Sequence, residues 1–166
     1  MQETENPAFL VNTSDDQIII KIKDRVSYLN AGPLNQFFDS VIAKGSNTFI
    51  IDFRDCSSMD STFLGILASA ALATRKSSGK ITLVNLSVRN LELIKNLGLH
   101  QITIVDETDY QDYSIEERME LLDGNKTANK ETILSAHETL AELNEKNAQS
   151  FEAVLECLHE KTEETR

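Results

Sequence analysis

The spacing of apolar residues in the first hundred positions alternates between the period of a strand and that of a helix. Ala8–Val11 and Gln17–Lys23 are short apolar stretches separated by turn-forming residues, so we expect them to pair as a β-hairpin. The next segment, Asp24–Ala31, is a predicted loop, although it carries three apolar or aromatic residues.

Three helix–glycine–strand units follow the hairpin. Apolar residues three and four positions apart predict the helices, and glycines end them. The run TFIIDF is nearly continuous and is typical of a central strand covered on both faces. Alternation of this kind predicts an α/β sheet with helices packed against it. In chain order the predicted elements are a helix from Gly32-Pro33 to Gly45, the strand Thr48–Phe53, a helix from about Ser61 to Lys76, the strand Lys80–Leu86, a helix capped by Ser87 that runs through Leu97 to Gly98, and the strand Gln101–Val105.

After Asp106 the pattern changes, and no strand candidate is left. Ser114–Leu122 predicts a short amphipathic helix that begins with the spacing of a capping box. From about Asn129 to Glu164 the chain predicts one long helix or two. An apolar stripe with a period of about 3.5 runs along this segment and is interrupted by polar residues. The stripe consists of Ile133, Leu140, Phe151, Val154 and Leu158, and the interruptions are His137, Asn144 and Asn147.

Three interpretations of this C-terminal segment stay open. It is an amphipathic helix that lies on another surface, a self-associating segment that forms a homodimer through the C-terminal helices, or a solvated tail. Charge divides the chain at the same place. Residues 1–106 hold 11 acidic and 10 basic residues, whereas residues 107–166 hold 16 acidic and 6 basic residues. We therefore predict a domain over 1–106 and an acidic helical extension over 107–166.

Composition excludes several classes of partner. A pI of about 4.7 argues against nonspecific nucleic-acid binding and against docking on an anionic membrane surface. No apolar run approaches the roughly 20 residues of a membrane span, and Met1–Pro7 lacks the pattern of a secretory leader. Two cysteines are too few for a disulfide framework. We expect a soluble, cytoplasmic protein without membrane insertion.

Residues with the chemistry of catalysis are scattered. The chain has no glycine-rich phosphate loop, and its three histidines lie in different segments. Cys157 and His159 are interpreted as surface residues of a helix, and Cys56 as a small apolar residue of the core. We therefore expect no enzyme activity, no metal and no cofactor.

One segment, Phe49–Lys76, combines a strand, a polar loop over Arg54–Met59 and an unusual helix. Asp60 and Ser61 are both good N-cap residues, so a simply capped helix is one interpretation. The helix is apolar nearly all round from Phe63 to Ala73, which predicts a second covered face. The tail helix and another protein are the two candidates for that cover.

A hydroxyl at a helix N-terminus is also suited to a phosphorylation switch. Phosphorylation adds about −1.5 to −2 charges. The helix dipole and free N–H groups tolerate this charge, so the fold survives the modification. An apolar or acidic partner resting on the same helix end would be repelled.

The run Asp55-Cys56-Ser57-Ser58-Met59-Asp60-Ser61-Thr62-Phe63-Leu64-Gly65 resembles the signature of STAS domains, specifically of the anti-sigma factor antagonists. In that family an apolar strand leads to a Ser-containing loop and then to Asp-Ser-Ser/Thr at the start of a helix. The resemblance covers roughly 100 of the 166 residues. It implies a mixed sheet of four to five strands with helices mainly on one face.

The resemblance also implies a function. The Ser that follows the motif Asp is the family's phosphoacceptor, which places it at Ser61, with Thr62 as the lesser candidate. The partners implied are an anti-sigma factor that is also a GHKL-type serine kinase, and a PP2C-type phosphatase that removes the phosphate. Any ATP then belongs to the kinase. The residues expected to contact the partner are Asp60, Ser61, Thr62, Phe63, Leu64, Ser27 and Tyr28.

The chain departs from the family pattern at two places, which bear on the kinase–substrate geometry, and Phe63 together with the long tail motivates an alternative. Phe63 stands where the family usually has Gly, and the loop after the second strand meets the family's acidic character only in part, through Asp24. The acidic extension lies outside the minimal family domain. The alternative is a scaffold or accessory STAS module of a signalling or transport complex, which never cycles phosphate.

Overall fold

The elements follow the predicted alternation of strands and helices. The computed structural model describes residues 9–13, 16–111, 119–122 and 126–164. In chain order they are β1 (Phe9–Asn12), β2 (Ile18–Val26), α1 (Gly32–Ala43), β3 (Thr48–Met59), α2 (Ser61–Lys76), β4 (Lys80–Val84), α3 (Val88–Asn96), the 3-10 helix η1 (Leu99–Gln101), β5 (Ile104–Asp106), β6 (Glu120–Leu121), α5 (Lys130–Leu143) and α6 (Glu145–Glu164).

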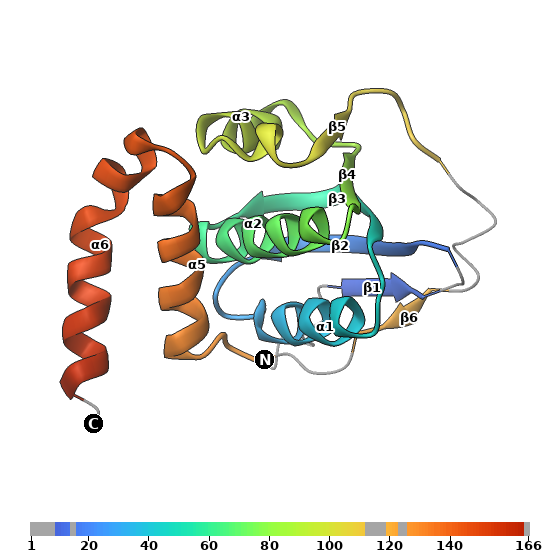
Figure 1. Ribbon diagram of the computed structural model, residues 1–166. Coiled ribbons are helices and arrows are strands. Elements are labelled where there is room, and N and C mark those ends of the chain that lie inside the picture. Colours follow the sequence, from blue (N-terminus) through green and yellow to red (C-terminus); the bar gives the residue numbers. More distant parts are fainter. Residues whose placement is uncertain (1–8, 14–15, 112–118, 123–125, 165–166) are drawn as a thin grey trace, which may run out of the picture.

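The described strands form one mixed sheet in the order β5-β4-β3-β2-β1-β6. Strands β2, β3, β4 and β5 are parallel to one another, whereas β1 is antiparallel to both β2 and β6. The predicted hairpin is confirmed by the β1–β2 pair, in which Phe9 lies opposite Ile22. Helices α1 and α2 lie on one face of this sheet (Figure 1). The predicted α/β architecture is confirmed, with six strands instead of four to five.

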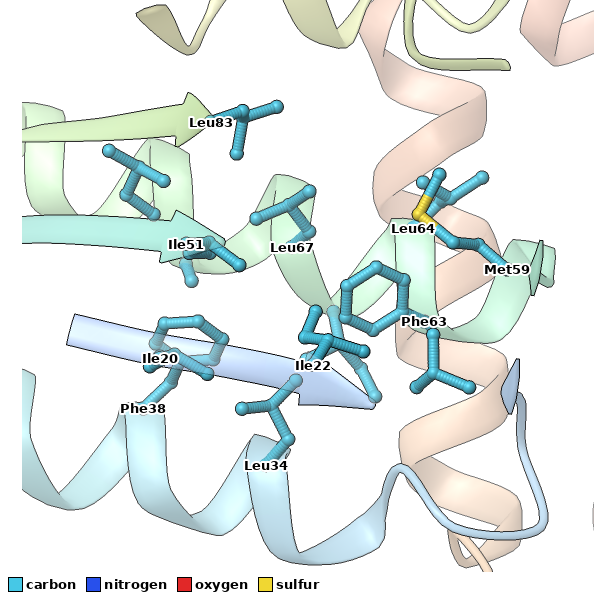
Figure 2. Packing of buried hydrophobic residues seen from close by; sticks show 14 of the residues in the cluster. Ile20, Ile22, Leu34, Phe38, Ile51, Met59, Phe63, Leu64, Leu67 and Leu83 are labelled. Atoms are coloured by element: carbon cyan, nitrogen blue, oxygen red, sulfur yellow. The ribbon is translucent and has the colours of Figure 1, made fainter. Parts of the chain in front are cut away.

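The hydrophobic core lies between that face and the two helices. Alternate residues of β3, namely Phe49, Ile51 and Phe53, point into it and are at most 1% exposed. Ile50 and Asp52 point the other way and are half-buried, so the second face of the strand is covered in part. Figure 2 shows the packed cluster, which includes Ile20, Ile22, Leu34, Phe38, Ile51, Met59, Phe63, Leu64, Leu67 and Leu83.

The central strands extend beyond their predicted ends. β2 includes residues 24–26, and β3 includes the whole of Arg54–Met59, both of which we predicted as loop. The two strands keep pairing through two register shifts, as far as Val26 opposite Met59. Irregular pairing of this kind removes the strict alternation of apolar and polar residues that identifies a strand in a sequence. The longer pair delivers Ser27 and Asp60 to one end of the sheet.

Two later predictions also need correction. Gln101–Val105 is not a continuous strand, because Gln101 ends η1 and the strand β5 begins only at Ile104. The expectation of no strand after Asp106 is wrong, since β6 pairs with β1. Of the predicted helix Ser114–Leu122, residues 119–122 are not helical, and residues 114–118 lie outside the described part of the chain.

The C-terminal segment is two helices rather than one. Asn144 has an extended backbone after α5, and its side chain accepts a hydrogen bond from the Asn147 backbone N–H at 2.8 Å, at the start of α6. Helix α5 packs on α2, and α6 packs on α5 (Figure 1). The interpretation of an amphipathic helix lying on another surface is therefore confirmed for α5. Within the described residues, no helix is both long and apolar enough to cross a bilayer.

Candidate functional site

Asp60 joins the first turn of α2 to the loop that follows β2. One carboxylate oxygen accepts from the Phe63 backbone N–H at 2.9 Å, and the other accepts from the Tyr28 backbone N–H at 2.8 Å. The Asp60 N–H donates to the carbonyl of Val26, the last residue of β2. Asp60 is thus the N-cap that its residue type predicts, and it also fixes the Ser27–Ala31 loop beside the helix end.

The same loop is joined to the segment that leads into α5. The Tyr28 carbonyl accepts from the Ala128 backbone N–H at 2.6 Å, and the Gly32 N–H donates to the Lys126 carbonyl at 3.2 Å. A Cβ at Gly32 would lie 2.9 Å from the Lys126 oxygen, so only glycine allows this approach. Ala128 itself is 3% exposed. The start of the extension is therefore fixed next to the Asp60 carboxylate.

Ser61, the first residue of α2, contacts a histidine of the extension. Its Oγ lies 2.8 Å from His137 Nε2. The other ring nitrogen, Nδ1, lies 2.7 Å from the carbonyl oxygen of Ile133. A carbonyl only accepts, so Nδ1 carries a proton, and Nε2 and the Ser61 hydroxyl share the second hydrogen bond of the ring. The ring is 5% exposed and packs edge-on against Phe151 of α6, with ring centroids 5.6 Å apart.

Close helix packing extends the contact along α2. A Cβ built on Gly65 would fall 2.3 Å from the carbonyl oxygen of Ala136, so α5 approaches the backbone of α2 directly. One turn further on, Ser69 Oγ donates to Thr139 Oγ1 at 2.9 Å. One cavity of about 250 Å³ adjoins this helix pair, and its lining does not include Ser61 or His137. The Ser–His hydrogen bond is thus a packing contact between two helices.

The seven residues predicted to contact a partner are gathered at this end of the sheet, with unequal exposure. Asp60 and Ser61 are half-buried, and the Tyr28 side chain is 45% exposed. The other four, Ser27, Thr62, Phe63 and Leu64, are buried. Direct contact between these four and a partner stays a prediction.

Phe63 occupies the core rather than a surface groove. Its ring packs edge-on against Phe53 with centroids 6.3 Å apart, and its side chain is fully buried. Figure 2 shows it in the cluster with Ile22, Met59 and Leu64. The aromatic residue that departs from the family pattern therefore fills space between α2 and the sheet.

Two side chains of β3 have raised pKa values. Burial raises the pKa of the Cys56 thiol to about 11, and a hydrogen bond to the Ser58 carbonyl opposes this in part. The interpretation of Cys56 as a small residue of the core is confirmed, since it is 5% exposed. The hydrogen bond with the Asp109 carboxylate raises the pKa of Arg54 and ties residue 109 to the middle of β3.

His137 is the site residue that the sequence did not reveal. Seventy-six positions separate it from Ser61, and the three histidines were expected to be unrelated. The available signal was its place in the apolar stripe of the extension, where a polar side chain needs a partner when it is buried.

Among the described residues, no cluster of three or more His, Cys, Asp or Glu side chains has the geometry of a metal site. The interpretation of Cys157 and His159 as surface residues agrees with their exposure, and His159 also contacts Glu138 of α5.

A strand pair that ends at an Asp-capped helix with Ser at its first position is the arrangement expected from the motif. The sequence matches the STAS domain family over residues 8–110. The chain belongs to the STAS domain family. The match ends before β6, so the STAS domain is followed by a strand and two helices that lie beyond it. No curated protein matches the sequence.

Solved structures of anti-sigma factor antagonists share the fold of this STAS domain. SpoIIAA in its unphosphorylated form matches with a TM-score of 0.55 and 17% identity, over 66% of this chain and 96% of its own. The phosphorylated form of SpoIIAA, a Bacillus cell fate determinant, matches with a TM-score of 0.54 and 18% identity, over 66% and 98%. An anti-sigma factor antagonist from Mycobacterium paratuberculosis matches with a TM-score of 0.52 and 20% identity, over 65% of this chain and 92% of its own. At these identities the likeness establishes the fold.

Proposed function

We propose that this protein is an anti-sigma factor antagonist that binds an anti-sigma factor with serine kinase activity and is switched off by phosphorylation of Ser61. The observation that carries the proposal is the position of Ser61 as the first residue of α2, directly after the N-cap Asp60. The STAS family membership and the SpoIIAA-like fold support it. A PP2C-type phosphatase restores the unmodified form, and the protein acts in the cytoplasm as a substrate rather than as an enzyme.

The local electrostatics allow a phosphate at this position. A helix N-terminus stabilises negative charge through its dipole, typically by about 0.3–1 kcal/mol at an exposed site. Asp60 places a second negative charge beside it, and its carboxylate already accepts from the helix backbone. Phosphorylation therefore leaves α2 folded and makes its end strongly anionic. A partner that docks an apolar or acidic surface there loses affinity.

The test is incubation with candidate GHKL-type serine kinases and ATP, followed by mass spectrometry. We expect phosphate on Ser61 in the native protein and in Ser69→Ala, which removes another half-buried serine of α2. Ser61→Ala abolishes the modification. Phosphate that persists in Ser61→Ala, at Thr62 or elsewhere, contradicts the assignment of the acceptor.

Binding to the anti-sigma factor separates the two states. Ser61→Ala is expected to bind as the native protein does, and Ser61→Asp to bind at least about tenfold more weakly, because it adds charge at the contact. Equal affinity of the two variants contradicts the switch.

The alternative function is a STAS scaffold that does not cycle phosphate. The hydrogen bond between Ser61 and the buried His137 favours it, since the hydroxyl is engaged within the chain. Phosphoserine 61 in protein isolated from cells excludes this alternative, and its absence under all conditions of growth supports it.

A further inference from the structure

Helix α5 covers the part of α2 where Ser61 lies. The contact is built from backbone and small residues at Gly65 and Ala136, where no other side chain fits between the helices. Ala136 and Leu140, one turn apart on α5, are 2% and 0% exposed, so the helix is docked over more than one turn. The contact with α5 explains why α2 is apolar nearly all round, because its second face is covered as well.

Helix α5 also contacts the Ser61 hydroxyl, which is the group that the proposed function modifies. The Ser61 hydroxyl is hydrogen-bonded to His137 Nε2, and Phe151 of α6 packs edge-on against the imidazole ring. A phosphoryl donor cannot approach an oxygen whose outward direction is occupied by a buried ring at 2.8 Å. A phosphoryl group on the same oxygen adds three oxygen atoms in the space that the ring fills.

Charge acts in the same direction as this steric exclusion. Residues 107–166 carry 16 acidic and 6 basic residues, so the extension repels a phosphate on α2.

The extension stays attached when α5 leaves α2. Ala128 and Lys126 bond to the Tyr28 loop, and β6 pairs with β1, so both anchors lie before α5 begins. A short tether gives a detached helix a high effective concentration at its own site. A partner in solution must therefore compete with a cover that is always near.

We propose that the α5–α6 hairpin is an intramolecular cover of Ser61, and that docking of the cover and phosphorylation of Ser61 exclude one another. This inference rests on the proposed function for Ser61 as the phosphoacceptor and for the kinase that modifies it. The unmodified, covered protein is protected from the kinase. Phosphorylation traps the uncovered state and frees the hairpin.

The first test needs no kinase. Phosphoserine is incorporated at position 61 of the full chain during translation, and hydrogen exchange of the α5 amides is followed by mass spectrometry. A freed helix of 14 residues is marginal in water, so its amides are expected to exchange at least about tenfold faster than in the unmodified protein. The control is phosphoserine at Ser150, an exposed residue of α6, which adds the same charge to the same hairpin. Unchanged or slower exchange with phosphoserine 61, as a pairing of phosphate with His137 would give, overturns the proposal.

The second test removes the cover without altering α2. Ala136→Arg places a long side chain against Gly65, whereas Ala153→Arg makes the same substitution at an exposed position of α6. Faster α5 exchange in Ala136→Arg but not in Ala153→Arg is expected, together with Ser61 phosphorylation at least about tenfold faster. Equal phosphorylation rates in Ala136→Arg and the native chain overturn the cover but leave the phosphoacceptor in place. Absence of phosphate on Ser61 in every variant, with α5 released by phosphoserine 61, contradicts the proposed function and leaves the exclusion standing.

Discussion

The two helices of the extension resemble one another in sequence but differ in how they are held. Both are amphipathic and rich in acidic residues, yet α5 buries Ala136, His137 and Leu140 against the STAS domain. In the described part of α6 the fully buried residue is Asn147, and Val154 of the apolar stripe is 40% exposed. The difference shows that docking depends on a small residue and on polar side chains that find partners, more than on the number of apolar residues.

The largest difference in unfolding free energy is expected between a leucine truncation in α5 and a valine truncation in α6. Leu140→Ala removes a fully buried side chain and should lower the free energy of unfolding by about 2–4 kcal/mol, whereas Val154→Ala should change it by less than about 0.5 kcal/mol. Urea denaturation of both variants measures this. Equal losses would mean that α6 is docked as firmly as α5.

A buried asparagine joins the two helices to the domain. Asn147 Nδ2 donates to the carbonyls of Leu97 and Leu140 at 2.8 and 2.9 Å, so Asn147→Ala leaves two acceptors without this donor. We expect a loss of about 1–3 kcal/mol in the free energy of unfolding. Gln149→Ala, at an exposed position of the same helix, is the control and should be neutral. A neutral Asn147→Ala would show that the corner between α5 and α6 is not anchored there.

The serine–serine comparison is expected to give a smaller effect. Ser69→Ala removes the hydrogen bond to Thr139, but Thr139 Oγ1 still donates to the Ser135 carbonyl. The expected cost is about 0.5–1 kcal/mol of unfolding free energy, against none for the exposed Ser150→Ala. If Ser69→Ala lost more unfolding free energy than Asn147→Ala, the Ser69–Thr139 hydrogen bond would hold the extension more firmly than Asn147 does.

The two cysteines distinguish the regions without changing stability. At pH 8 a thiol with a pKa of about 11 is about one part in a thousand thiolate, and Cys56 is also buried, whereas Cys157 of α6 is exposed. Alkylation of the native protein followed by peptide mass spectrometry should therefore label Cys157 and spare Cys56. The folded Cys157→Ser variant, in which Cys56 is the remaining cysteine, should take up no label. Rapid labelling of Cys56 would show that the end of β3 opens readily.

The sequence predicted the elements that have regular periodicity and clear ends. The helix of α2, its N-cap Asp60 and the position of Ser61 were all expected, because capping uses residue types that act locally. The hairpin of β1 and β2 was expected for the same kind of reason. The extra strand β6 was missed since two exposed residues leave no pattern.

Contacts between segments distant in the chain were harder to predict from the sequence. A covered face on α2 was predicted, and the tail helix was one of two candidates for the cover. The partners were not predicted, because the pairing of Ser61 with His137 depends on where the chain returns after residue 106. In retrospect the three polar interruptions of the apolar stripe are the informative residues: His137 contacts Ser61, Asn144 starts α6 and Asn147 binds two carbonyls.

The lengths of the outer strands limit how copies of this protein can associate. β5 and β6, which lie at the two edges of the described sheet, have three and two residues. Short edges present few unpaired backbone groups and disfavour the edge-to-edge growth that leads to aggregation. Assembly of copies through either edge of the described sheet is therefore restricted.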